Sequence, residues 1–121
     1  MYYAEAIIKF LDPGSKYISG ILDRAKCLKT KNGFLIKDLR IVSNRDLKNI
    51  LIVDNLAHSF GFQIENGVPI LEWYDSEKDQ ELLYLKEYLK EAALQDDVRE
   101  FNIKRLKLQE LGALEKEDLK L

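Results

Sequence analysis

Residues 50–55 read Ile-Leu-Ile-Val-Asp-Asn, and this short stretch decides how the rest of the sequence is interpreted. Four consecutive aliphatic residues without alternation predict a strand that is covered on both faces, as central parallel strands of α/β sheets are. Polar residues at the carboxyl end of such a strand stand where open α/β sheets bind ligands. We therefore expect an α/β fold, in which the oxygen atoms of Asp54 and Asn55 would suit Mg²⁺. Taken alone, an Asp-Asn pair after a strand more often forms a simple turn or helix cap, so the metal site is the alternative at this point.

The sequence before this strand predicts a helix and a hairpin. Apolar residues at helical spacing indicate a helix over residues 2–11, which the Asp-Pro-Gly of residues 12–14 would stop. Aromatic and branched residues at strand length favour a strand over residues 17–22. Asn32 and Gly33 lie between two further strand-like runs, residues 27–30 and 34–37, and Asn-Gly at this place is a strong hairpin signal.

The sequence after the strand predicts first more strand and then helix. Strand-like patterns cover residues 59–64 and 68–71, and Pro69 restricts the second to a sheet edge or a strand start. From Ser76, the expected N-cap, apolar residues repeat every three or four positions through residue 93. Asp96 and Asp97 would cap a further helix. The chain therefore ends in helices, followed by a charged tail over residues 112–121 that we expect to fray.

Composition and charge restrict the class of protein. The 121 residues are 46% apolar and 33% charged with only two prolines, which indicates one globular domain and excludes a disordered or collagen-like chain. A net charge of −2 favours neither nucleic acid nor an anionic membrane as a partner. The single cysteine excludes an internal disulfide and a cysteine zinc cluster. We expect a soluble intracellular protein.

Taken singly, the reactive side chains predict little chemistry. His58 is the one histidine, and without a glycine-framed serine a hydrolytic triad is disfavoured, so we expect a partly exposed ring beside the strand end. Cys27 has no evident histidine base and is expected to be a buried structural thiol. Arg24 and Lys37 are interpreted as surface cations, although each could neutralise a phosphate oxygen.

Taken together, several blocks of the sequence resemble one family in their order and spacing. The resemblance covers residues 2–105 and includes the blocks Arg24-Ala25-Lys26-Cys27, Lys37-Asp38-Leu39, Asn44-Arg45-Asp46-Leu47, Val53-Asp54-Asn55, Asn66-Gly67-Val68-Pro69 and Trp73-Tyr74-Asp75. The Lys-Asp-Leu, Asn-Arg-Asp-Leu and Val-Asp-Asn blocks make it specific. The family is the small phosphatases of the RNA polymerase II C-terminal domain, also called NLI-interacting-factor-like phosphatases, within the haloacid dehalogenase superfamily.

The resemblance implies a fold, an activity and a site. The implied fold is part of a Rossmann-like, haloacid dehalogenase-type parallel sheet with flanking helices and a β-hairpin insertion. The implied activity is Mg²⁺-dependent removal of phosphate from phosphoserine or phosphothreonine in proteins, through an aspartyl-phosphate. Lys37 matches the lysine that binds the phosphoryl group, and Asp54 and Asn55 match the metal site. Arg24 matches a phosphate-binding arginine, although the family's Arg-Glu-Ser-Cys reads Arg-Ala-Lys-Cys here.

One departure from the family matters more than these agreements. The family's nucleophile and general acid/base come from an Asp-x-Asp-x-Thr segment, and no two aspartates of this chain are separated by a single residue. We therefore expect residues 1–111 to be the C-terminal portion of the phosphatase domain, inactive alone. A non-catalytic pseudophosphatase or protein-interaction module is the alternative, and an accessory subunit whose missing strand comes from another chain is a weaker one.

The expected partners follow from this interpretation. A phosphoprotein or another protein is the expected partner, with no direct contact to nucleic acid or membrane, in the nucleus or cytoplasm. The resemblance places the nucleophile strand beside residues 50–53, so that without it an apolar strand has an unpaired edge. We expect this edge to lower the stability of the chain or to make it self-associate.

Overall fold

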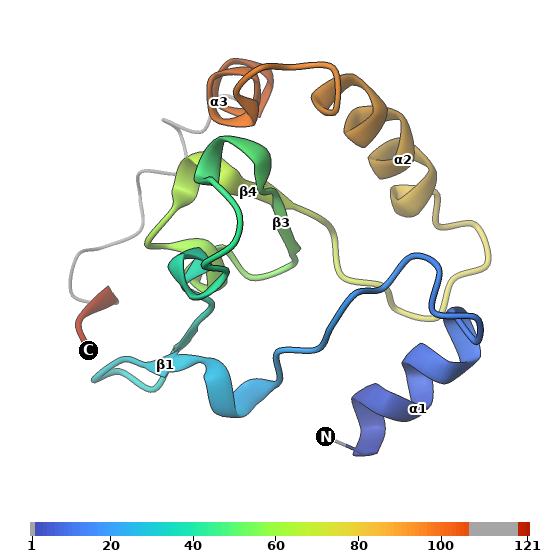
Figure 1. Ribbon diagram of the computed structural model, residues 1–121, viewed down its shortest axis with the longest axis horizontal. Coiled ribbons are helices and arrows are strands. Elements are labelled where there is room, and N and C mark those ends of the chain that lie inside the picture. Colours follow the sequence, from blue (N-terminus) through green and yellow to red (C-terminus); the bar gives the residue numbers. More distant parts are fainter. Residues whose placement is uncertain (1, 107–118) are drawn as a thin grey trace.

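Short helices and short strands make up the described part of the chain (Figure 1). The computed structural model describes residues 2–106 and 119–121, and within them the α-helices are α1 (Tyr2–Leu11), α2 (Glu81–Ala92) and α3 (Val98–Leu106). The strands are β1 (Leu28–Lys29), β2 (Leu35–Ile36), β3 (Ile52–Asp54) and β4 (Gly67–Pro69). β1 pairs antiparallel with β2, and β3 pairs parallel with β4. The prediction of a mixed α/β fold is confirmed.

The hairpin forms where the Asn-Gly pair predicts it. Gly33 has a φ of 87°, a conformation that costs glycine little because it has no Cβ. Thr30 closes the turn: its backbone N–H donates to the Phe34 carbonyl at 2.8 Å, and its hydroxyl accepts from the Phe34 N–H at 3.0 Å. Thr30 is 4% exposed, so these bonds are shielded from water. The hairpin therefore has a defined shape that can position the residues after β2.

The parallel pair β3–β4 forms the centre of the molecule (Figure 1). Its register sets Ile52 opposite Gly67 and Asp54 opposite Pro69. Gly67 has to be glycine, because a Cβ there would lie 2.1 Å from the ring of Phe60, which is fully buried. Close packing of this ring on the strand backbone joins β4 to the turn that follows β3.

A buried amide holds helices α2 and α3 to this sheet. Asn102 of α3 is fully buried, and its Nδ2 donates to the carbonyls of Glu65 at 3.0 Å and Gly67 at 2.8 Å. The Tyr88 hydroxyl of α2 donates to the Asn102 Oδ1 at 2.5 Å. Burial raises the pKa of Tyr88 to about 12, so the phenol stays protonated as a donor at neutral pH. One side chain thus joins two helices and β4.

Two strand predictions are wrong because local hydrogen bonds compete with sheet formation. Residues 17–22 form no strand, since the Asp12 carboxylate accepts from the backbone N–H groups of Lys16, Tyr17 and Ile18 at 2.8–3.0 Å. The Ile18 bond is the largest cause of the lowered pKa of Asp12. Residues 59–64 instead contribute to the 3₁₀ helices Ala57–Phe60 and Ile64–Asn66, whose N–H groups bond to carbonyls three residues back.

The prediction for residues 50–53 is also only partly right. The strand comprises Ile52–Asp54, and Val53 is 36% exposed. Because residues 50–53 are half-buried or exposed, the stretch is not covered on both faces. In the part of the chain that the structure describes, β3 pairs with β4 alone, so its other edge has no strand partner. The helix expected from Ser76 begins only at Glu81, because the hydroxyl of Ser76 accepts from the Lys78 N–H and closes a separate turn.

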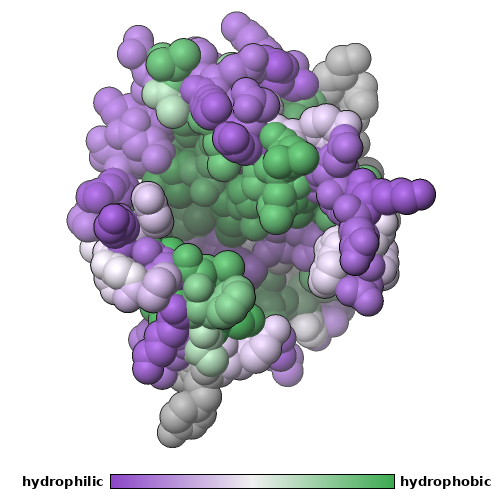
Figure 2. Space-filling model, turned by 90° about the vertical axis from the view of Figure 1, so that its right-hand side faces the viewer, coloured by the Kyte–Doolittle hydropathy of each residue, from purple (hydrophilic) through white to green (hydrophobic). Residues whose placement is uncertain are grey.

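Much apolar surface faces outward on the side of α2. Figure 2 shows hydrophobic side chains gathered around a hollow and bordered by hydrophilic ones. Leu82, on the predicted apolar face of α2, is 72% exposed.

No helix within residues 2–106 and 119–121 has the length and apolar character needed to cross a bilayer. Most of the predicted tail, residues 112–118, lies outside the described residues, while the Lys120 carbonyl accepts from the Lys31 N–H of the hairpin at 2.7 Å.

Candidate functional site

A buried carboxylate ends the central strand. Asp54 is the last residue of β3 and is 8% exposed. Its Oδ1 accepts from the backbone N–H of Leu56 at 2.9 Å, which turns the chain sharply after the strand. Its Oδ2 accepts from the Nζ of Lys37 at 2.6 Å. The carboxylate is thus held in one orientation at the carboxyl end of a parallel strand.

Lys37 reaches Asp54 because the hairpin packs beside the turn after β3. The backbone N–H of Lys37, directly after β2, donates to the Ser59 carbonyl at 2.7 Å. Nearby, the rings of Phe34 and His58 stack with their centroids 4.0 Å apart. The Lys37 side chain is 51% exposed, so it remains open to solvent while its ammonium group contacts Asp54. The lysine can therefore accept a new anionic partner without leaving the site.

All four of the predicted site residues line one cavity of about 600 Å³. Lys37 and Asp54 are in direct contact, Asn55 follows Asp54, and Arg24 comes from the short 3₁₀ helix Arg24–Lys26. Two carboxylates, Asp23 and Asp54, line this cavity together with two cations and one amide. The two cations, Arg24 and Lys37, suit an anionic ligand such as a phosphate group.

The same cavity has a donor set that suits Mg²⁺ in kind. Mg²⁺ needs only one or two protein carboxylates, and it completes its shell with water and phosphate oxygens. Asp54 offers one carboxylate, whose two oxygens each have one hydrogen-bond partner and retain further lone pairs. Asn55 adds an exposed amide oxygen. Among the described residues no group of three or more His, Cys, Asp or Glu side chains could hold a metal ion, so this small set is the candidate.

The hairpin and the turn also contribute side chains that the sequence alone did not assign to the site. Cys27, Phe34 and His58 line the cavity. His58 is half-buried beside the strand end, as expected, whereas Cys27 is half-buried and not the buried thiol that was predicted. Its place at the open base of the hairpin explains the difference. The Asn-Gly turn was the available signal, because it brings the residues on its two sides together.

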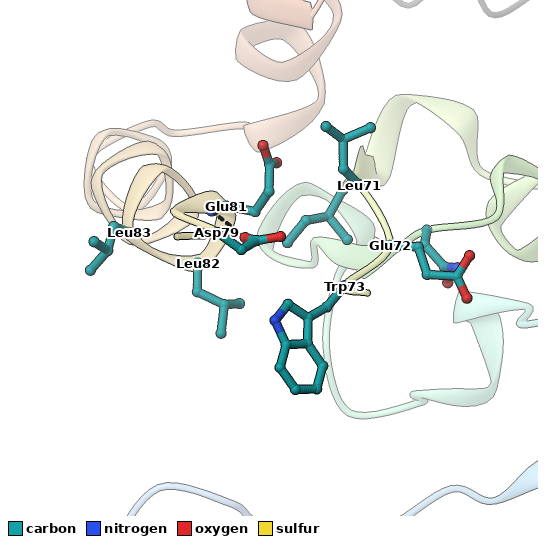
Figure 3. Close-up of a pocket in the computed structure, with 9 residues that line it drawn as sticks. Leu71, Glu72, Trp73, Asp79, Glu81, Leu82 and Leu83 are labelled. Carbon is teal, nitrogen blue, oxygen red and sulfur yellow. Dashed lines mark hydrogen bonds between the residues drawn. The ribbon is translucent and has the colours of Figure 1, made fainter. Parts of the chain in front are cut away.

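A second cavity, of about 560 Å³, lies between the segment after β4 and the start of α2. Figure 3 shows the Trp73 indole facing Leu82, and the Asp79 carboxylate lying between α2 and Leu71. Asn55 lines this cavity as well as the first one. The two cavities therefore meet at the residue that follows the candidate metal ligand Asp54.

Comparison with known proteins identifies the family of the chain. A family model described as NLI interacting factor-like phosphatase matches residues 1–99. The chain belongs to this family. The resemblance stated from the sequence blocks is therefore confirmed.

Individual relatives of the chain include phosphatases and a translocase subunit. The chain is 39% identical to CTD small phosphatase-like protein 2 of Dictyostelium discoideum, over 90% of this chain and 19% of that protein. It is 41% identical to the mitochondrial import inner membrane translocase subunit TIM50 of Candida glabrata, over 82% of this chain and 20% of that protein. It is 31% identical to human carboxy-terminal domain RNA polymerase II polypeptide A small phosphatase 1, over 79% of this chain and 36% of that protein. The chain thus spans between about a fifth and just over a third of these relatives.

Proposed function

We propose that this chain carries the lysine and metal-binding half of a Mg²⁺-dependent phosphatase site that acts on phosphoserine or phosphothreonine in proteins. The observation that carries the proposal is the contact between Lys37 and the buried Asp54 at the carboxyl end of β3. Because Arg24 and Asn55 line the same cavity, a phosphate-binding pair and a metal-binding pair share one space. The nucleus or the cytoplasm is the proposed location.

Each residue has a definite task in this proposal. Lys37 and Arg24 bind the phosphoryl oxygens, and the exposed stem of Lys37 lets its ammonium group turn from Asp54 toward a phosphate. Asp54 and Asn55 would hold Mg²⁺, which when bound offsets negative charge on the phosphoryl group. The Leu56 N–H keeps the Asp54 carboxylate in place when Lys37 turns away.

The nucleophile is proposed to come from outside these 121 residues. An aspartyl-phosphate mechanism needs one carboxylate as nucleophile and a second for proton transfer, and the chain holds no Asp-x-Asp pair. The outer edge of β3, which has no strand partner among the described residues, is where we place the strand that carries this pair. That strand would complete the Rossmann-like sheet of the haloacid dehalogenase type. The chain alone is then inactive.

A complementation assay tests the proposal. The purified chain is mixed with an Asp-x-Asp-x-Thr segment of a family member, and Mg²⁺-dependent hydrolysis of p-nitrophenyl phosphate is followed. We expect no turnover by the chain alone, turnover with the segment, and a loss of about a hundredfold or more in Lys37→Ala and Asp54→Ala. Lys29→Ala and Asp46→Ala are matched controls on exposed residues that do not line the cavity. Hydrolysis by the chain alone that depends on Asp54 would overturn the claim of inactivity, and insensitivity to Lys37→Ala would overturn the site.

A non-catalytic role in protein binding is the second candidate. Two observations favour it. Arg24 and Lys37 line the cavity although the chain holds no Asp-x-Asp pair, and the chain is similar to TIM50, whose name describes a translocase subunit. A phosphopeptide that binds with dependence on Arg24 and Lys37, yet is not hydrolysed after complementation, would favour this role over catalysis.

A further inference from the structure

The cavity at Trp73 combines an exposed aromatic ring with apolar walls. Trp73 is 63% exposed, and its Nε1 donates to the Ser76 carbonyl at 3.0 Å, which holds the ring in one orientation. Leu71 and Leu82 stand near it and are 73% and 72% exposed. Figure 3 shows the indole facing Leu82. A flat apolar group of a ligand could therefore lie against the ring.

The charge of this cavity has one sign only. Glu72, Asp79 and Glu81 line it, while none of its lining residues is a lysine or an arginine. Glu72 accepts from the Tyr74 hydroxyl at 2.8 Å, and Asp79 accepts from the Glu81 N–H at 2.9 Å. Within residues 2–106 and 119–121, none of the three carboxylates has an ion-pair partner. A neutral apolar ligand would displace the water that hydrates these carboxylates and would offer no hydrogen-bond donor in its place, so its binding would be disfavoured.

An arginine side chain suits both the exposed indole with its apolar walls and the acidic lining of this cavity. A guanidinium group is flat and weakly hydrated, stacks on an indole face, and donates two parallel hydrogen bonds to a carboxylate. A lysine ammonium would meet the charge but would lack the flat face and the paired donors. The aliphatic stem of arginine can cover the exposed leucines. An arginine of a bound peptide is therefore the occupant to which we commit.

We propose that the Trp73 cavity is a subsite for an arginine of the peptide whose phosphorylated residue enters the cavity of Lys37 and Asp54. Asn55 lines both cavities, so one extended peptide can occupy them together. The placement of the phosphorylated residue rests on the proposed function, whereas binding of the arginine does not. The subsite would select substrates with a basic residue near the phosphorylation site.

Fluorescence tests the subsite directly, because Trp73 is the only tryptophan of the chain. The chain is titrated with an unphosphorylated peptide that holds one arginine, and with the same peptide holding the neutral isostere citrulline. We expect a saturable change in Trp73 emission that is roughly tenfold weaker in affinity with citrulline. Asp79→Asn should weaken binding of the arginine peptide several-fold, because Figure 3 shows the Asp79 carboxylate on the same side of the segment as the Trp73 indole, and the amide keeps an oxygen acceptor for the Glu81 N–H. Glu77→Gln, an exposed carboxylate that does not line the cavity, should leave the affinity unchanged.

A phosphorylated version of both peptides separates this inference from the proposed function. Phosphoserine should strengthen binding, and Lys37→Ala should remove that gain while leaving the arginine-citrulline difference intact. If phosphoserine adds nothing but arginine still exceeds citrulline, the subsite stands and the phosphate site is wrong. Equal binding of arginine and citrulline peptides, or an effect of Glu77→Gln as large as that of Asp79→Asn, would overturn the subsite.

Discussion

Replacing Asn102 with alanine tests how the helices are held to the sheet. The change removes both hydrogen bonds from its Nδ2 to the Glu65 and Gly67 carbonyls, and the one that its Oδ1 accepts from Tyr88. The Gly67 bond is buried, so its carbonyl loses a partner that water cannot easily replace; the other two groups are partly buried. The buried carbonyl should contribute about 1–3 kcal/mol and each of the other two groups about 0.5–1.5 kcal/mol. The free energy of unfolding should therefore fall by about 4 kcal/mol.

Urea denaturation followed by circular dichroism measures this loss. Asn44→Ala is the matched control, because this asparagine is exposed and its side chain makes no hydrogen bond to any residue that the structure describes. It should change the free energy of unfolding by less than about 0.5 kcal/mol. Tyr88→Phe removes one bond of the three and should cost about 1 kcal/mol. The effects of Asn102→Ala and Tyr88→Phe should not add, since they share a bond. A loss below about 1 kcal/mol for Asn102→Ala, or full additivity, would refute the reasoning.

Two further predictions concern acid stability and association. The Arg99 side chain donates hydrogen bonds to the Asp97 carboxylate and lowers the pKa of that carboxyl from 3.8 to about 2. Because the pKa is lower in the folded state than in the unfolded state, the pair stabilises the fold above pH 3.8. This stabilisation is lost as the pH falls toward 2. The free energy of unfolding of Arg99→Gln should therefore vary less between those pH values than that of the original chain, and equal slopes would contradict the pairing. The unpaired edge of β3 should make the chain self-associate, and Val53→Lys should reduce this in sedimentation velocity, because a lysine disfavours edge-to-edge pairing. A monomer at all concentrations would contradict this prediction.

Local sequence signals predicted those parts of the fold that local interactions decide. The end of α1 near Asp12 and the hairpin at Gly33 depend on residues a few positions apart, and both are found where expected. The strand expected over residues 17–22 failed because its N–H groups meet the carboxylate of Asp12, a competitor that a strand pattern does not reveal. The exposure of Val53 was likewise invisible, because the burial of a strand depends on its neighbours and not on its own composition.

The sequence by itself determined the family, the class of fold and the four candidate site residues, because these depend on residue types in a fixed order. Only the tertiary structure decided that the Lys37 ammonium group contacts Asp54, and that Arg24 and Asn55 line the same cavity. It also decided that Trp73 shares a second, acidic cavity with α2. The physical reason is that these contacts join segments far apart in the chain, and their distances are set by how the hairpin, the β3–β4 pair and the helices pack.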